Sequence, residues 1–212
     1  MEAKLQVTRR RGRPPRQRAS VIGTRDLLLR AGLEVLTEKG FATACIEEIL
    51  TRVQVPKGSF YHYFESKEAF GLELIERYAE FFARKLDRHF LDPALSPLKR
   101  IHAFIDDAKA GMARFEYRRG CLIGNLGQEM AALPESFRAS LKDTFEDWQN
   151  RLATCLIEAQ NAGELASEID PRQVAAFFWI GWEGAVLRAK LDQSVAPLEI
   201  FTEFFFAGLP TK

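Results

Sequence analysis

The chain has 212 residues, of which 47% are hydrophobic and 28% are charged, so it is long and apolar enough to bury a core of its own. It contains neither an uncharged apolar run of 18 residues nor an apolar segment after its first arginines, and we expect neither a membrane span nor a secretory signal. The three cysteines, Cys45, Cys121 and Cys155, form no Cys-x-x-Cys pair. This predicts a cytoplasmic protein without a disulfide framework, a metal site or a cofactor.

Charge is divided unevenly along the chain. Residues 1–67 hold 13 lysines and arginines against 7 acidic residues, whereas residues 68–212 hold 17 against 22. A basic first third on an acidic remainder indicates that the first third binds a polyanion. The alternative is a basic disordered tail without such a partner, since 7 of those 13 cations lie in residues 1–20.

The spacing of apolar residues predicts an all-α protein after a disordered basic arm at 1–20. In the arm, the run RRRGRPPR at positions 9–16 has no apolar period, and its prolines oppose a helix. From about Val21 the spacing becomes helical, and Gly40 is placed to end this first helix as its C′ residue. Proline, glycine and the capping residue Ser66 separate further predicted helices at 46–53, 56–64, 67–90, 98–116, 121–131, 135–162, 171–192 and 197–207.

The short helices at 46–53 and 56–64, joined by a tight turn, have the size of a helix-turn-helix. In that motif the second helix enters the major groove, and the residues at its start are small or polar so that backbone N–H groups reach phosphate. The candidates for this role are Lys57, Gly58 and Ser59. We therefore expect a three-helix DNA-binding domain at 21–66 and a helical body for effector binding and dimerisation at 67–212.

Aromatic residues fill the rest of the second short helix. Tyr61 and His62 come one turn after its start and are candidates for contacts with phosphate or a base edge. Phe60 and Phe64 are better explained by burial in the core, which is the usual role of such an aromatic cluster.

The stretch VPKGSFYHYFESKE at 55–68, with Ala31, Gly40-Phe41 and Glu48-Ile49 before it, resembles the signature of the TetR family of bacterial one-component repressors. The resemblance covers about residues 24–75. It implies that Lys57, Tyr61 and His62 face operator DNA and that Lys67 contacts phosphate. The family often has Thr-Ser before its second helix where this chain has Ala44-Cys45, so Thr43 is expected to take over the cap and phosphate contact there.

The arm contains Arg11-Gly12-Arg13-Pro14, which resembles the core of an AT-hook. In such a segment Arg11 and Arg13 would enter a narrow A·T minor groove. The alternative is a tail that binds phosphate without sequence preference.

Two segments of the body, 120–129 and 179–190, resemble one branch of the family, which holds the regulator of acrylate utilisation and the electrophile sensor of the N-ethylmaleimide reductase operon. The resemblance implies a homodimer through the helices at 171–192 and 197–207, with Phe205 at the seam. It also implies an effector such as acrylate or a related small unsaturated acid or electrophile. The alternative is a sensor that is modified covalently at Cys121. In the electrophile sensor, a cysteine and a lysine at the positions of Cys121 and Lys190 act together.

Cys121 follows Arg118-Arg119-Gly120 at the expected start of a helix. A helix N-terminus and nearby cations both favour the thiolate, which predicts a lowered thiol pKa. The alternative is an inert buried cysteine. We expect the effector to bind among six residues: Cys121, Asn125, Trp182, Glu183, Lys190 and Arg118. Asn125 and the Trp182 indole are candidate donors to its carboxylate.

Glu183 is the one charged residue between Val174 and Leu187, in a helix that is apolar on all sides. A buried carboxylate needs a partner. The candidates are a bound ligand, a group across the dimer seam, or one of the cations Arg118, Arg119, Arg188 and Lys190.

Two other functions are weaker explanations of the sequence. A cysteine enzyme would use Cys121 with His89 or His102 as base, but no oxyanion pattern accompanies them. An architectural DNA-binding protein would ignore small ligands. We therefore expect a repressor that binds double-stranded operator DNA as a homodimer and is released by a small-molecule effector.

Overall fold

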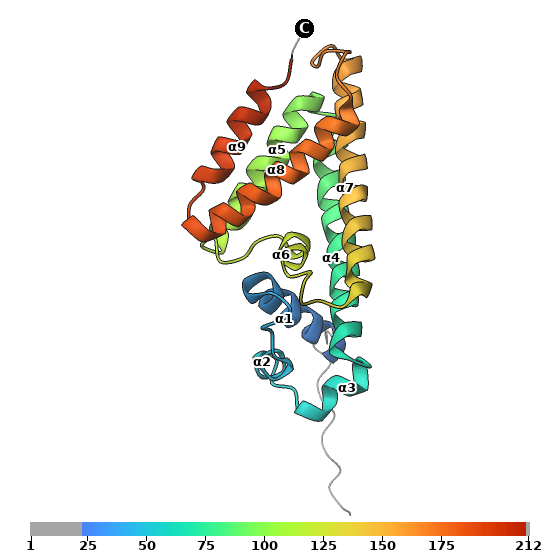
Figure 1. Cartoon of the computed structure of the whole chain (residues 1–212), viewed down its shortest axis with the longest axis vertical. Helices are drawn as coiled ribbons and strands as arrows, with labels where there is room; N and C mark the ends of the chain where they lie inside the picture. The colour runs from blue at the N-terminus through green and yellow to red at the C-terminus, as the bar shows by residue number, and fades with distance from the viewer. Residues whose placement is uncertain (1–22, 211–212) are drawn as a thin grey trace, which may run out of the picture.

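The computed structural model describes residues 23–210, and all regular secondary structure in this range is helical. The elements follow in chain order (Figure 1): α1 (Thr24–Lys39), α2 (Ile46–Arg52), the 3₁₀ turn η1 (Lys57–Ser59), α3 (Phe60–Tyr63), α4 (Lys67–Phe90), α5 (Pro97–Arg114), α6 (Leu122–Gln128), α7 (Glu135–Asn161), α8 (Pro171–Asp192) and α9 (Ala196–Ala207). The all-α prediction is confirmed. None of the described helices is long and apolar enough to cross a membrane.

Local signals in the sequence fix where the helices begin and end. Gly40 ends α1 with a φ of 83°, a left-handed conformation that glycine adopts without strain. Ser66 caps α4 and accepts a hydrogen bond from the backbone N–H of Ala69 at 3.0 Å, as predicted. The predicted third helix differs at its start, because residues 57–59 form a 3₁₀ turn that tightens the entry into α3.

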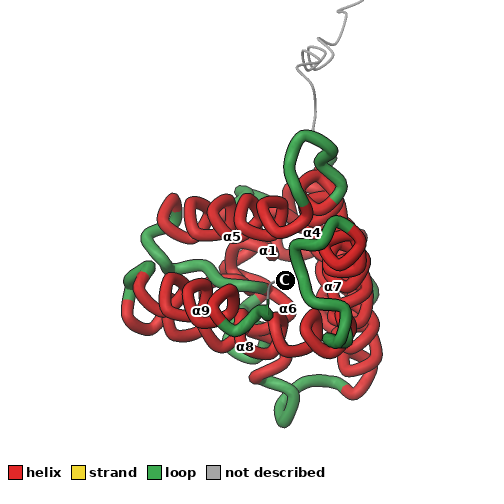
Figure 2. The backbone as a smooth tube through the Cα atoms, turned by 90° about the horizontal axis from the view of Figure 1, so that it is seen from above, coloured by secondary structure: helices red, strands yellow, loops and turns green. Residues whose placement is uncertain are grey.

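The helices form two tiers (Figure 1). The small tier holds α1, α2 and α3, and the long helix α4 runs from it into the body. There α4 packs with α5 and α7, α8 packs on α7, and α9 lies on the outside of α8 (Figure 2). The short helix α6 lies between the two tiers and contacts α1, α4 and α7.

The two tiers share a continuous hydrophobic core. In the small tier, Phe60 and Phe64 are buried against Phe70 of α4, as predicted. In the body, the interior is rich in aromatic rings, and Trp148 and Trp179 are fully buried there. The core therefore crosses from one tier to the other along α4.

Candidate functional site

The start of the second short helix is open to solvent and carries the predicted DNA-binding groups. The Lys57 side chain is 75% exposed, and Tyr61 and His62 are exposed beside it. Lys57 Nζ lies 2.5 Å from Oε1 of Glu47 on α2. The hydrogen bond to Lys57 is the main cause that lowers the pKa of Glu47, and the same bond raises the pKa of Lys57. The ammonium of Lys57 is therefore exposed but paired with a carboxylate of the preceding helix.

Two other predicted DNA-contacting residues, Thr43 and Lys67, have partners within the protein. The Thr43 hydroxyl donates to the Lys39 carbonyl at 2.7 Å, and Cys45, not Thr43, occupies the cap position of α2. The expected capping role of Thr43 is therefore wrong. Lys67 donates to the Phe41 carbonyl at 2.8 Å, so a phosphate contact would share this ammonium with Phe41. Arg11 and Arg13 lie outside the described residues.

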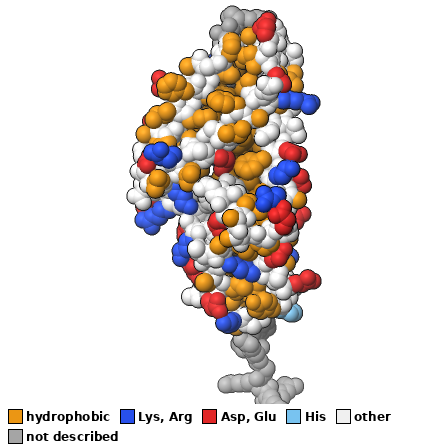
Figure 3. All heavy atoms as spheres, viewed as in Figure 1, with side chains coloured by type: hydrophobic (Ala, Val, Ile, Leu, Met, Phe, Trp, Pro, Cys, Tyr) orange, Lys and Arg blue, Asp and Glu red, His pale blue; other side chains and the backbone are white. Residues whose placement is uncertain are grey.

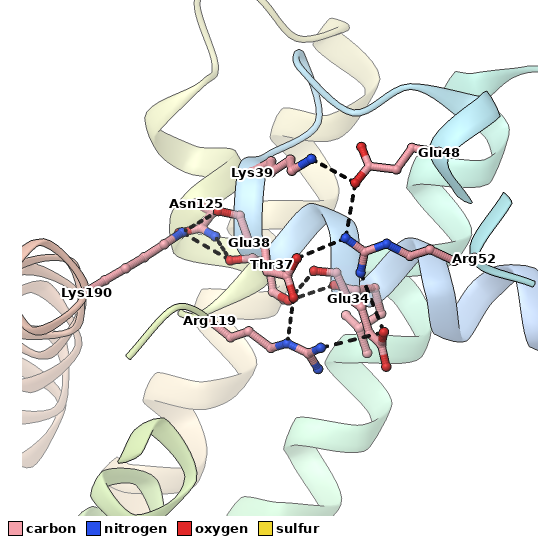
Figure 4. Close-up of polar contacts among 10 residues, drawn as sticks. Glu34, Thr37, Glu38, Lys39, Glu48, Arg52, Arg119, Asn125 and Lys190 are labelled. Atoms are coloured by element: carbon pink, nitrogen blue, oxygen red, sulfur yellow. Dashed lines mark hydrogen bonds and ion pairs between the residues drawn. The ribbon is translucent and has the colours of Figure 1, made fainter. Parts of the chain in front are cut away.

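Two side chains of the body cap the C-terminal end of α1 (Figure 4). Nζ of Lys190, on α8, donates to the carbonyls of Thr37 at 3.1 Å and Glu38 at 3.0 Å. Nδ2 of Asn125, on α6, donates to the same Thr37 carbonyl at 2.9 Å. The last carbonyls of a helix have no partner within it and carry partial negative charge, so a lysine and an amide donor satisfy them well.

Ion pairs and backbone hydrogen bonds extend this contact. Arg119, which precedes α6, pairs with Glu38 at 3.2 Å and with Glu34 at 3.6 Å on α1 (Figure 4). Glu129, at the other end of α6, accepts hydrogen bonds from the backbone N–H groups of Phe41 at 3.1 Å and Ala42 at 2.8 Å. We call this set of contacts the α1 joint. On the body side it is formed by Arg119, Asn125, Glu129 and Lys190.

The predicted effector residues therefore do not converge on one pocket. Asn125 and Lys190 are directed to α1, and Arg118 is exposed and pairs with Glu116 at 2.6 Å. Trp182 is buried and stacks on Phe178 in the core of the body. Of the six predicted residues, Asn125 and Lys190 meet at the Thr37 carbonyl of α1, and Cys121 and Glu183 meet where the start of α6 faces α8.

Cys121 is the N-cap residue of α6, as predicted, but its thiol is buried. Its Sγ accepts a hydrogen bond from the backbone N–H of Gly124 at 3.4 Å. Burial raises the pKa of the Cys121 thiol well above its usual value, and the carboxylate of Glu183 adds to the effect. The predicted lowered pKa is wrong, because burial outweighs the helix N-terminus and both neighbouring arginines pair with carboxylates elsewhere.

Glu183 has none of the predicted cations as its partner. Lys190 and Arg119 belong to the α1 joint, and Arg188 pairs with Asp192. Its carboxylate lies against the backbone of α6, where a Cβ added to Gly124 would come within 1.9 Å of Oε2. Burial raises the pKa of Glu183 to about 7, an effect that the contact with Cys121 opposes.

Tyr78 of α4 completes this polar cluster beneath α6. Burial raises the pKa of Tyr78 well above its usual value, and Cys121 and Glu183 contribute to the increase. Side chains from α4, α6 and α8 therefore meet in one small polar cluster.

Two buried indoles were missed in the sequence. Within the described residues, Nε1 of Trp148 and Nε1 of Trp179 are the buried side-chain nitrogen or oxygen atoms that have no hydrogen-bond partner. A buried donor without an acceptor costs about 1–3 kcal/mol. The ring centroids of the two indoles lie 5.0 Å apart. No signal in the sequence could have revealed this pair, because the indoles come from different helices.

Large apolar side chains are exposed along α8 and α9, and apolar atoms are prominent on the half of the molecule that these helices form (Figure 3). The most exposed of them are Phe177, Ile180, Leu191, Ile200 and Phe204. Phe204 is 72% exposed, whereas Phe205 is buried within the chain against Phe178 and Phe201. The prediction that Phe205 lies at the dimer seam is therefore wrong, and the neighbouring Phe204 faces outward instead.

Two short helices joined by a tight turn, with the start of the second open to solvent, on a larger helical body that caps the end of α1, define a helix-turn-helix transcriptional regulator. The family model described as "Bacterial regulatory proteins, tetR family" matches residues 28–74, and the one described as "Tetracyclin repressor-like, C-terminal domain" matches 97–205. The chain belongs to the TetR family and is a DNA-binding transcriptional repressor, not an enzyme.

The matches to individual proteins extend over most of the chain. The transcriptional regulator AcuR of Cereibacter sphaeroides is 55% identical over 203 residues, which are 96% of this chain and 92% of that protein. The transcriptional repressor NemR of Escherichia coli is 31% identical over 83% of this chain and 88% of its own length. A crystal structure of a TetR regulatory protein from Rhodobacter sphaeroides superposes with a TM-score of 0.85 at 55% identity, over 86% of this chain and 97% of that chain.

Proposed function

We propose that the protein represses transcription as a homodimer and leaves its operator when a small molecule binds in the body. The observation that carries this proposal is the α1 joint. Lys190 of α8 and Asn125 of α6 both hold the end of α1, so the body acts directly on the DNA-binding domain. The domain boundaries that we propose are 21–66 for DNA binding and 67–212 for the body. The protein acts in the cytoplasm, where its operator is.

The proposed dimer uses α8 and α9 of both protomers. The exposed side chains of Ile180, Leu191 and Phe204 support it, because large apolar side chains gathered on the surface of neighbouring helices are typical of a protein interface. A twofold dimer places two reading helices in successive major grooves, about 34–36 Å apart. The proposed contacts to DNA come from Thr43, Lys57, Gly58, Ser59, Tyr61, His62 and Lys67, with Arg11 and Arg13 of the arm in addition.

Release follows if the effector changes how α4, α6 and α8 pack in the body. These three helices meet at Tyr78, Cys121 and Glu183, and two of them carry the capping residues of α1. A displacement at this cluster moves Lys190 and Asn125 relative to Thr37 and changes the spacing of the reading helices. The effector needs only different affinities for the two arrangements.

We propose acrylate or a related small unsaturated acid or electrophile as the effector. The resemblance of residues 120–129 and 179–190 to the acrylate branch of the family supports this choice. The burial and raised thiol pKa of Cys121 favour reversible binding over covalent addition.

The test is a DNA-release titration with full-length protein. An operator is first selected from random duplexes, and fluorescence anisotropy then follows its release by acrylate, with propionate as the saturated control. Saturable release by acrylate is expected. If no small unsaturated acid or electrophile changes operator binding, the proposed release by an effector is wrong. An architectural DNA-binding protein would then be the better explanation.

A further inference from the structure

The described part of the buried core contains two side-chain donors without a hydrogen-bond acceptor. Trp148 of α7 and Trp179 of α8 are fully buried, and the Nε1–H group of each has no acceptor among the described residues. An indole N–H is a donor only. The two unpaired donors lie on indole rings that contact each other, with centroids 5.0 Å apart and an angle of 42° between their planes.

The rings around this pair form an apolar enclosure. Phe82 of α4 lies 4.3 Å from Trp148 and 6.1 Å from Trp179, measured between ring centroids, and Phe104 of α5 lies 5.9 Å from Trp179. Among the described residues, the cation–ring contacts involve Phe41, Phe64 and Phe115, not these indoles. The pair thus combines two donors with aromatic walls, and no cation lies over either ring.

We propose that Trp148 and Trp179 form the effector subsite and bind the carbonyl oxygen of a small uncharged compound: an amide, an ester, an aldehyde, a ketone or an acid in its protonated form, so that acrylate would bind here as neutral acrylic acid. The inference rests on the proposed function, in which a small molecule binds in the body. Two neutral donors satisfy a carbonyl oxygen, but they do not replace the hydration of an ionised carboxylate in an apolar enclosure. Tyr78, whose ring lies 6.5 Å from that of Trp148, links this subsite to Cys121 and Glu183, and a charged Glu183 disfavours an anion further.

Binding at this subsite acts on α4. The Phe82 ring is only partly buried and contacts Trp148, so an acceptor reaches the indole donors by displacing it. Phe82 and Tyr78 stack on each other one turn apart on α4, with ring centroids 5.7 Å apart. Displacement of this stack moves α4, the helix that continues to the DNA-binding tier.

The experiment records the indole N–H resonances of the ¹⁵N-labelled full-length protein by NMR, with Trp182 as the internal reference. Propionamide and propionate are the probes, because they share a carbon skeleton and a carbonyl but differ in charge. We expect saturable shifts of the Trp148 and Trp179 resonances with propionamide, and affinity for propionate lower by about tenfold or more. Trp148→Phe and Trp179→Phe each keep an aromatic ring, remove one donor and should weaken propionamide binding about three- to tenfold. The matched control, Trp182→Phe, should leave that affinity nearly unchanged.

The wild-type spectra decide the proposal even if a variant fails to fold. Two results would overturn the subsite. One is that saturating propionamide and acrylate leave the indole resonances unshifted. The other is that the indole N–H groups contact water molecules that neither probe displaces. Equal affinity for propionate and propionamide would overturn the preference for an uncharged carbonyl. Acrylate release of DNA without indole shifts would refute the subsite alone. Indole shifts with propionamide but no release by any effector would support the subsite and refute the proposed function.

Discussion

Nζ of Lys190 donates to the backbone carbonyl of Thr37, 153 positions earlier in the chain, at a distance of 3.1 Å. This hydrogen bond connects α8, in the middle of the body, to the last turn of α1 in the DNA-binding tier. Burial lowers the pKa of Lys190, while Glu129 and Glu38 counteract part of this effect. The contact therefore ties the last turn of α1 to the body.

Replacing Lys190 with methionine should weaken operator binding. The variant keeps a long apolar side chain but removes the donor to Thr37 and Glu38, so we expect about 1 kcal/mol lower stability and about fivefold lower operator affinity. Chemical denaturation and fluorescence anisotropy measure the two effects. Arg188→Met, which removes an exposed cation from the same helix, is the control. Equal DNA affinity in the two variants would contradict a role for the joint.

The ion pair between Lys57 and Glu47 predicts opposite effects of two substitutions on DNA binding. Lys57→Ala should weaken binding to all sequences and flatten the salt dependence by about one unit, because one phosphate contact is lost. Glu47→Gln should strengthen binding, because Lys57 no longer has to leave a carboxylate 2.5 Å away. Anisotropy titrations at several salt concentrations measure both slopes. A Glu47→Gln variant that binds DNA more weakly would show that Glu47 has another role at the interface.

Adjacent phenylalanines of α9 should respond differently to aspartate. Phe204→Asp places a charge on an exposed position, so the chain should fold but remain monomeric and lose operator binding. Phe205→Asp buries an unpaired charge among aromatic rings and should unfold or aggregate the chain. Analytical ultracentrifugation and circular dichroism distinguish the two results. A dimeric Phe204→Asp variant would exclude this face as the seam.

The raised pKa of Glu183 predicts a specific pH dependence of stability. Its pKa is about 7 in the folded protein against an ordinary value of 4.5, so the folded state holds this proton more tightly. The associated stability is fully present below pH 4.5 and is lost as the pH rises through 7, a change of up to about 3 kcal/mol. Glu183→Gln should remove this component. We would measure urea unfolding of both proteins between pH 5 and 8, because their difference isolates Glu183 from other titrating groups. Parallel curves would contradict the raised pKa.

Burial of Cys121 predicts slow alkylation. Its thiol is 8% exposed and has a raised pKa, whereas Cys45 is exposed. N-ethylmaleimide at pH 7 should therefore modify Cys45 at least about 100-fold faster than Cys121. Intact-protein mass spectrometry of the wild type and of Cys45→Ser measures both rates. Rapid labelling of Cys121 in the native Cys45→Ser protein would instead favour a covalent electrophile sensor.

Local sequence was sufficient to predict most helix boundaries and the DNA-reading segment. Gly40, Ser66 and the prolines act on their own neighbourhood, because a cap or a break in a helix depends on only a few adjacent backbone groups. The helix-turn-helix is similarly compact in sequence, so residue types at fixed spacing identified it. The roles assigned to its individual side chains in DNA contact stay predictions.

Only the tertiary structure decided the chemistry of the body. Cys121 has the local features of an activated thiol, yet burial and a carboxylate from another helix raise its pKa. Lys190 and Asn125 are plausible ligand-binding residues in sequence, but in the structure they satisfy the carbonyls at the end of α1. Which of two consecutive phenylalanines faces solvent depended on how α9 packs on α8. In each case the residue that determines the outcome lies far away in sequence. Burial and electrostatic interactions act through space, so they cannot be predicted from the residues adjacent in the chain.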